Sequence, residues 1–421
     1  MILRRSSLAA FLFVSATALA LFLGGALLND LGFNYSIDSS AGGLKLHPYT
    51  LLTVLSLLTV CCGPQSLRQC LGNRQFVTGM SCAGATVAIV FVKSHSGDAQ
   101  SLGFAFDTIV SAFVAVAVVS SLRPHVERKV SALALAFIVV ESVMAIIEVT
   151  TRTNFIPFDI WYGSWFRSTA LHGHPLNNAL VLVTVATSVQ SYAGRRISVL
   201  VGLCTTAALL AFGARGALAA YLAVNAIALV RFAMRKPGWV PFILVGIALF
   251  AGLFIAAIFN GALGDRIAAV GAYDDSSAVR VQSVQLISQL DWQRIVTGIS
   301  PDDAARIMDR NQIGVIENFL VGYILTFGAL ATVIILGCAY WTFRSFFAGL
   351  TPASRFRGWM IVLVFACTAL TNNSLMTKTP ALYLLVVGLW CFRVRVRQRE
   401  PQRTAQPMTL PNSLLINGVA R

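Results

Sequence analysis

Apolar residues occur along nearly the whole chain in long runs that are separated by short polar or basic breaks. A helix needs roughly 20 mainly apolar residues to cross about 30 Å of hydrocarbon. The runs therefore predict an all-α, polytopic integral membrane protein with about twelve transmembrane helices. The expected spans are 8–28, 47–62, 75–93, 102–122, 130–149, 174–191, 197–213, 215–232, 241–259, 316–341, 358–376 and 380–392.

The composition supports lipid as the solvent. Hydrophobic residues make up 57% of the 421 residues and charged residues only 12%, whereas soluble domains are about half apolar and a quarter charged. The first run follows Arg4-Arg5 and resembles a signal sequence, but it is longer than an ordinary signal core, so we expect a retained first helix. The 8 cysteines show neither a disulfide framework nor zinc spacing.

The net charge of +15 reflects orientation rather than nucleic-acid binding, because the basic residues are scattered through short loops. With both termini in the cytoplasm, every inner loop is basic, as the positive-inside rule requires. We expect a multi-pass protein of the bacterial inner membrane. Residues 1–392 are the expected transmembrane domain, and the basic, Pro-, Gln- and Asn-rich residues 393–421 are expected to be a disordered cytoplasmic tail.

This topology puts one large loop, residues 260–315, in the periplasm between the ninth and tenth spans. Loops of this length within a compact fold are usually functional. Val281, Val284 and Ile287 stand at helical spacing, which predicts an amphipathic helix lying across the mouth of the bundle.

Polar residues precede the sixth span at the outer face. They are Arg167, His172, His174, Asn177 and Asn178, in the segment Arg-Ser-Thr-Ala-Leu-His-Gly-His-Pro-Leu-Asn-Asn. Backbone N–H groups at a helix N-terminus bind anions, so these residues are candidates for binding a polar or phosphorylated substrate. The alternative is a helix cap with interfacial polar groups.

Three further positions at the same face carry candidate chemistry. Arg215, in Gly-Ala-Arg-Gly, is either an interfacial anchor or a planar fork for phosphate oxygens. Arg280 in the long loop is either solvated or part of the same site. Glu317 either caps the helix dipole or acts as a base toward a sugar hydroxyl. Asn318, which follows it, is a further candidate for substrate binding.

Ionisable residues also fall inside spans. Glu141 and Glu148 share a helical face in the fifth span, and Asp107 lies in the fourth. Such residues often mark function, so they are candidates for a proton relay in a transporter. We expect instead that they pair with arginines such as Arg215 or Arg152.

Taken together, these motifs resemble the O-antigen ligase and O-antigen polymerase superfamily of bacterial surface-polysaccharide enzymes. The resemblance covers roughly residues 160–340. It rests on His-Gly-His-Pro-Leu-Asn-Asn178, on Gly213-Ala-Arg-Gly216, on Arg280 followed by Gly298, and on Glu317-Asn-Phe-Leu with Gly328. Ligases of the superfamily carry histidine at the position of Glu317, so the resemblance favours a polymerase of exopolysaccharide or O-antigen repeat units.

The resemblance implies a glycosyltransferase with neither metal nor cofactor. Its donor would be a glycan on undecaprenyl pyrophosphate and its acceptor a glycan hydroxyl at the periplasmic face. Arg215, Arg280 and Glu317 would be catalytic, and a chain-length regulator and a flippase would be partners. The alternatives are a ligase to lipid A-core, a transporter or flippase, and a non-catalytic scaffold of an assembly complex.

Overall fold

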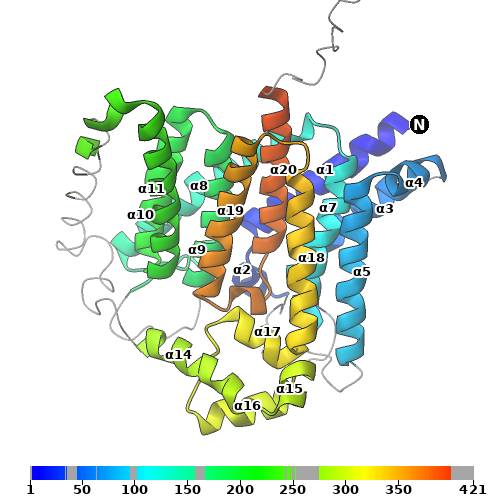
Figure 1. The fold of residues 1–421 in the computed structure, drawn as a ribbon, viewed down its shortest axis with the longest axis vertical. Coiled ribbons are helices and arrows are strands. Elements are labelled where there is room, and N and C mark those ends of the chain that lie inside the picture. The colour runs from blue at the N-terminus through cyan, green and yellow to red at the C-terminus, as the bar shows by residue number, and fades with distance from the viewer. Residues whose placement is uncertain are drawn as a thin grey trace, which may run out of the picture.

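The computed structural model describes residues 2–33, 35, 45–62, 64–94, 102–156, 166–241, 244–246, 248, 252 and 275–399. Within these ranges the chain forms helices and turns and no strand, which confirms the predicted all-α class. Figure 1 shows most of the long helices running side by side as one bundle.

The first half of the chain supplies the helices on one side of the bundle and part of its centre. They are α1 (Ile2–Phe22), α2 (Gly25–Asp30), α3 (Pro48–Cys61), α4 (Pro64–Leu71), α5 (Arg74–Ser94), α6 (Leu102–Ala105), the π-helical turn η1 (Phe106–Val110), α7 (Ser111–Ser121), α8 (Val126–Thr151) and α9 (Pro175–Tyr192).

The second half continues the bundle and adds the helices of the long loop. They are α10 (Arg195–Ala211), α11 (Arg215–Arg235), η2 (Pro237–Trp239), α14 (Asp275–Ser288), α15 (Trp292–Thr297), α16 (Pro301–Arg310), α17 (Phe319–Phe327), α18 (Ala329–Phe347), α19 (Pro352–Leu370), η3 (Ser374–Met376) and α20 (Ala381–Arg399).

Six of the described helical segments are long and apolar enough to cross a membrane: Arg74–Lys93, Gly103–Ser121, Val126–Thr151, Arg215–Arg235, Ala329–Phe347 and Pro352–Leu370. Shorter apolar helices occur at Ser6–Phe22 and Pro48–Cys61. The chain is thus a helical membrane protein by length and composition of its helices, and the count of twelve spans stays a prediction. Most of the expected ninth span, 241–259, lies outside the described residues.

The core is built around α7, α9 and α20, which are buried on nearly all sides. Most side chains of α9 from Asn178 to Val189 are buried, and α20 packs against both α9 and α7. A helix that is apolar all round belongs in the interior. Helices at the periphery instead expose apolar side chains, such as Val139 and Val143 of α8 and Leu330 and Val333 of α18, as lipid contact requires.

Several predicted boundaries need correction. The tenth span, 316–341, is two helices, because α17 ends at Gly328, whose φ of 84° is incompatible with a continuing helix. The eleventh, 358–376, is shifted: α19 begins at Pro352 and ends at Leu370. The helix α20 continues through Arg399, so residues 393–399 are helical rather than part of a disordered tail, and the remainder of that tail lies outside the described residues.

The end of α20 is held by an ion pair with the start of α8. Arg395 Nε lies 2.6 Å from Oε1 of Glu127, whose side chain is fully buried. The hydroxyl of Ser131 donates to the same carboxylate oxygen. This ion pair stabilises the helical conformation of the basic residues 393–399 at the end of α20.

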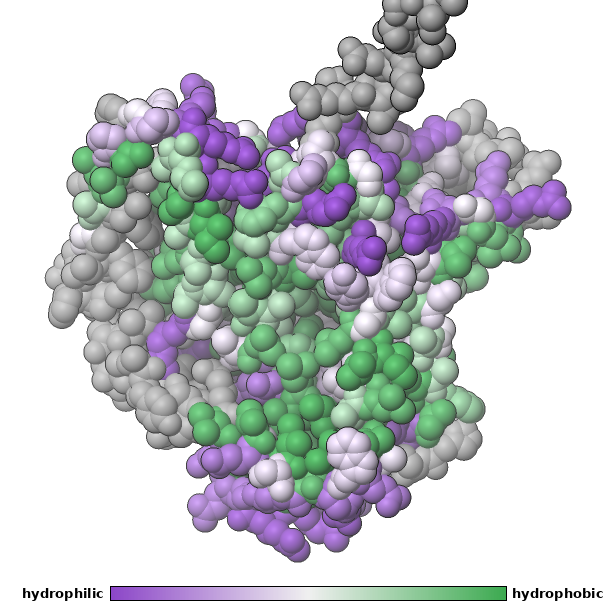
Figure 2. Space-filling model, viewed as in Figure 1, coloured by the Kyte–Doolittle hydropathy of each residue, from purple (hydrophilic) through white to green (hydrophobic). Residues whose placement is uncertain are grey.

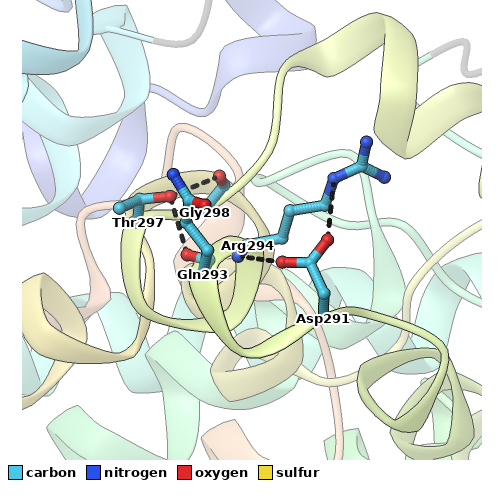
Figure 3. Close-up of polar contacts among 5 residues, drawn as sticks. All are labelled: Asp291, Gln293, Arg294, Thr297 and Gly298. Carbon is cyan, nitrogen blue, oxygen red and sulfur yellow. Dashed lines mark hydrogen bonds and ion pairs between the residues drawn. The ribbon is translucent and has the colours of Figure 1, made fainter.

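The described part of the long loop, from residue 275 onward, forms α14, α15 and α16, and α14 and α15 pack on α17. Leu290 packs with Val321 and Leu325 in a small apolar cluster that also includes partly buried isoleucines of the loop. In α15 the Asp291 carboxylate accepts from the N–H of Arg294 at 2.9 Å, and the same arginine's Nε lies 3.3 Å from the second carboxylate oxygen (Figure 3). The loop helices therefore have their own cap and core.

The helix predicted around residues 278–290 is present as α14, but its buried face differs from the expected one. Val281 and Val284 are each 53% exposed, whereas Ser283 and Leu286 are buried. The valine spacing predicted the helix correctly. Of the three spaced residues, Ile287 is on the packed side, where it contacts the cluster of Leu290, Val321 and Leu325, and the two valines are on the exposed side.

The two ends of the molecule are hydrophilic and its middle is apolar (Figure 2). Figure 1 shows the N-terminus and the end of α20 at one end of the bundle and α14–α16 at the other. Hydrophilic side chains concentrate at both ends, with apolar side chains between them (Figure 2). This is the distribution expected of a protein whose middle contacts lipid.

Candidate active site

A pocket of about 60 Å³ brings together residues from four separate segments at the end of the bundle that carries the loop helices. Its polar lining is Arg167, Arg215, Glu317, Thr371 and Asn372. A pocket of this size accommodates a small polar group or a few waters. The structure therefore joins Arg167, Arg215 and Glu317, three of the predicted site residues, in one place.

Arg167 belongs to the segment before α9, and a buried carboxylate holds this segment. Glu148 Oε2 accepts from the Ser168 hydroxyl at 2.5 Å and from the N–H groups of Thr169 and Ala170 at 2.8 and 2.9 Å. Its other oxygen accepts from the N–H of Phe155. Hydrogen bonds to a carboxylate are stronger than neutral ones, so Glu148 fixes the backbone that presents Arg167.

The guanidinium of Arg167 is also tied to the turn before α11. Its Nε donates to the carbonyl oxygen of Phe212 at 2.8 Å, and the N–H of Ser168 donates to the carbonyl of Ala211. The side chain is 8% exposed. The contact aligns the segment of Arg167 with the Gly-Ala-Arg-Gly turn, and the two arginines consequently line the same pocket.

The structure requires glycine at both glycine positions of this turn. Gly213 has a φ of 61°, which favours glycine. A Cβ on Gly216 would lie 2.6 Å from the Oγ1 of Thr371, so only glycine allows α11 to approach the loop after α19 this closely. Arg215, between them, is the first residue of α11 and is half-buried at the pocket.

Glu317 lies just before α17, beside the residue that caps it. Asn318 is the N-cap, with its Oδ1 accepting from the N–H groups of Leu320 and Val321. The N–H of Phe319 donates to the carbonyl of Asn372 at 3.2 Å. Asn318 therefore caps α17. Glu317 is half-buried and lines the pocket, and no capping contact of its carboxylate is described.

The remaining predicted binding residues serve the local structure. Asn178 is buried, accepts from the N–H of His172 at 2.8 Å and donates to the carbonyl of Thr169. His174 caps α9 by accepting from the N–H of Leu176. Asn177 is half-buried in the first turn of α9 and does not line the pocket.

His172 packs edge-on to Phe137 with ring centroids 6.0 Å apart. Burial lowers the pKa of His172 to about 3, so its imidazole is neutral at physiological pH. It does not line the pocket of Arg215 and Glu317. Its described contacts therefore support a packing role.

Arg280 is a residue of α14, and its side chain lies outside what the structure describes. Gly298, its partner in the sequence motif, ends α15 with a φ of 79°. Figure 3 shows the hydroxyl of Thr297 bonded to the carbonyls of Gln293 and Gly298 at this end. The N–H of Ile299 then donates to the carbonyl of Leu325 at 2.8 Å, which joins the loop to α17.

The expectation that the embedded acids pair with arginines is wrong. Glu148 is held by the backbone and hydroxyl donors described above, and Glu141 Oε2 accepts from the N–H of Leu171 at 3.3 Å. Asp107 accepts from the hydroxyls of Tyr35 and Thr50 at 2.6 and 2.7 Å. The donors to these carboxylates are backbone N–H groups and hydroxyls, and through them Glu148 and Asp107 hold the loops at this end in place.

Sequence reasoning missed Thr371 and Asn372, two residues of the pocket lining. They belong to the polar run Thr-Asn-Asn-Ser374, which the predicted span 358–376 included within a membrane helix. A polar run of four between two apolar runs was the available signal for a helix end.

No group of three or more His, Cys, Asp or Glu residues within the described ranges is arranged to hold a metal ion. Comparison with known proteins adds nothing further to the site, since no protein family model, no curated protein and no solved structure matches this chain.

Proposed function

We propose that this protein is a membrane glycosyltransferase that polymerises repeat units of an exopolysaccharide or O-antigen. It would transfer glycan from undecaprenyl pyrophosphate to a sugar hydroxyl of the acceptor chain. The observation that carries the proposal is the pocket lined by Arg167, Arg215 and Glu317. The motif resemblance supplies the substrate class.

The chemistry suits these side chains. The acceptor hydroxyl oxygen attacks the anomeric carbon of the donor, and the bond from that carbon to the pyrophosphate oxygen breaks. Undecaprenyl pyrophosphate leaves with the electron pair, and arginine forks stabilise the charge of its diphosphate through bidentate hydrogen bonds. Glu317 takes the proton of the attacking hydroxyl as general base.

The fixed positions of the two arginines support the proposal. Arg167 is fixed by Phe212 and, through its backbone, by Glu148. Arg215 is fixed by the close approach of Gly216 to Thr371. Preorganised charges stabilise a transition state more than mobile ones, because no reorganisation is needed during the reaction.

Reconstitution tests the proposal. The purified full-length chain in proteoliposomes, given undecaprenyl pyrophosphate carrying one repeat unit, is expected to produce a ladder of longer lipid-linked glycans. Transfer to lipid A-core without a ladder would establish a ligase instead. Movement of the lipid-linked glycan across the bilayer without new glycosidic bonds would establish a transporter, and inactivity of the pure chain that is relieved only by another enzyme would establish a scaffold.

The proposed orientation has α14–α16 in the periplasm and both termini in the cytoplasm of a bacterial inner membrane. It rests on the basic inner loops. A single cysteine introduced at Asp275 in a cysteine-free background is expected to react with a membrane-impermeant maleimide added to intact spheroplasts. Labelling only after the membrane is opened would show that α14–α16 face the cytoplasm, and it would contradict the proposal of an enzyme that acts at the periplasmic face.

A further inference from the structure

A much larger pocket, of about 590 Å³, lies at the opposite end of the bundle from the candidate active site. The start of α5, the end of α18, the start of α19 and the end of α20 surround it. Figure 2 shows hydrophilic side chains gathered over this end of α5 and α18, next to apolar ones further along. Its volume falls in the range of sites for small molecules.

Four arginines line this pocket: Arg74, Arg344, Arg355 and Arg393. No acidic residue is among its described lining, and none of the four forms an ion pair with a described carboxylate. Arg393 donates to the carbonyl of Ser345 at 3.1 Å, and the guanidinium of Arg344 lies 5.8 Å from the ring centroid of Trp341. Four cations gathered around a cavity whose described lining holds no carboxylate form a site suited to an anion.

The surface next to the arginines is apolar and aromatic. Tyr340 and Trp341 are 50% and 54% exposed, and Tyr340 stacks on Trp359 with centroids 5.7 Å apart. Further along α18, toward the middle of the bundle, Leu336 and Ile334 are 40% and 41% exposed. Tyrosine and tryptophan favour the level of the lipid headgroups, and exposed aliphatic side chains favour the acyl chains.

We propose that this pocket binds an anionic phospholipid of the surrounding leaflet. Its phosphate is held by the arginine forks, its headgroup fills the pocket between α5 and α18, and its acyl chains follow the exposed apolar residues of α18. Basic pockets between transmembrane helices bind anionic headgroups in this manner. A soluble anion would contact only the arginines, whereas a lipid would also contact the exposed apolar residues of α18. The observations therefore favour a lipid.

The test compares lipid binding by the full-length chain and by a double variant, Arg74→Gln with Arg344→Gln. Purified protein in nanodiscs or detergent is titrated with phosphatidylglycerol and with phosphatidylcholine, and binding is followed by native mass spectrometry. Phosphatidylglycerol is expected to bind in preference to phosphatidylcholine and to bind roughly tenfold more weakly to the double variant. Arg68→Gln, an exposed arginine of α4 at the same end that does not line the pocket, is the matched control and should bind as the unaltered chain does.

Three results would overturn the proposal. Equal binding of the two lipids, or unchanged phosphatidylglycerol binding by the double variant, would show that the arginines recognise no headgroup. Inorganic phosphate or glycerol phosphate that competes fully with phosphatidylglycerol at equal concentration would show that the ligand is a soluble anion. Because the measurement is binding at the opposite end of the bundle, its outcome is independent of the proposed polymerase activity.

Discussion

Gly298 and Gly328 lie against each other, one at the end of α15 in the long loop and the other at the break between α17 and α18. A Cβ on Gly328 would lie 2.7 Å from the backbone nitrogen of Gly298, and a Cβ on Gly298 would lie 2.8 Å from that of Gly328. Both have positive φ angles. Lys93, at the end of α5, donates to the adjacent Thr297 carbonyl. The loop helices therefore dock on the bundle by direct backbone contact.

This contact predicts that Gly328→Ala destabilises the docking of the loop. The new methyl group would lie 2.2 Å from the carbonyl oxygen of Val296, and alanine disfavours the positive φ. We expect a loss of about 1–3 kcal/mol, measured as a lower thermal unfolding midpoint and as faster proteolysis within residues 275–315. Gly337→Ala is the control, because that position is helical with open space around it, and it should be neutral or slightly stabilising. Equal behaviour of the two variants would contradict the account.

The pocket itself depends on the approach of Gly216 to Thr371. Gly216→Ala would force these residues apart and move Arg215, so activity is expected to fall about tenfold or more at normal protein abundance. Thr371→Ala removes two of the three atoms that a Cβ would meet, and it should therefore restore part of the activity in the double variant. Purely additive losses in the double variant would show that the two residues act independently.

The two buried glutamates of α8 are expected to differ in importance. Glu148→Ala leaves several buried N–H groups without an acceptor, which costs about 1–3 kcal/mol for each group that stays unsatisfied. Glu141→Gln replaces a buried carboxyl that accepts from only one described donor, at 3.3 Å, and should change stability little. The comparison is made by thermal unfolding in detergent. A Glu148→Ala variant as stable as Glu141→Gln would mean that Glu148 does not hold the segment of Arg167.

Apolar runs predicted most of the helices because lipid contact and the interior both demand apolar side chains. Hydropathy failed to predict the helix ends that are set by backbone geometry or by a short polar run. It joined α17 to α18 across Gly328, since hydropathy carries no information about φ, and it extended α19 over Thr371 and Asn372. Gly328 and the run Thr-Asn-Asn-Ser374 both indicated helix ends, but the long apolar runs on either side of them still predicted continuous spans.

The candidate site was predictable in part for a related reason. Arg215 and Glu317 stand at helix ends and Arg167 in the loop before α9, all on the same predicted membrane face, and segments on one face of a bundle are neighbours. The separate roles of His174 and Asn318 as caps follow from their positions directly before the helices that they cap. The backbone ligation of Glu148 was not predictable, because it depends on how a loop without regular structure folds over α8.

The central claim is that Arg215 and Glu317 act together on one reaction, and the rate of polymer formation in proteoliposomes tests it most directly. Glu317→Gln retains shape but loses the base, and Arg215→Ala loses the phosphate fork, so each is expected to lower the rate by about a hundredfold or more with donor binding retained in the glutamine variant. Arg215→Lys should recover only part of the activity, and the double variant should be scarcely slower than the worse single one. Asp309→Asn, an exposed acid of α16, is the control. A Glu317→Gln variant that polymerises donor at the unaltered rate would contradict the account.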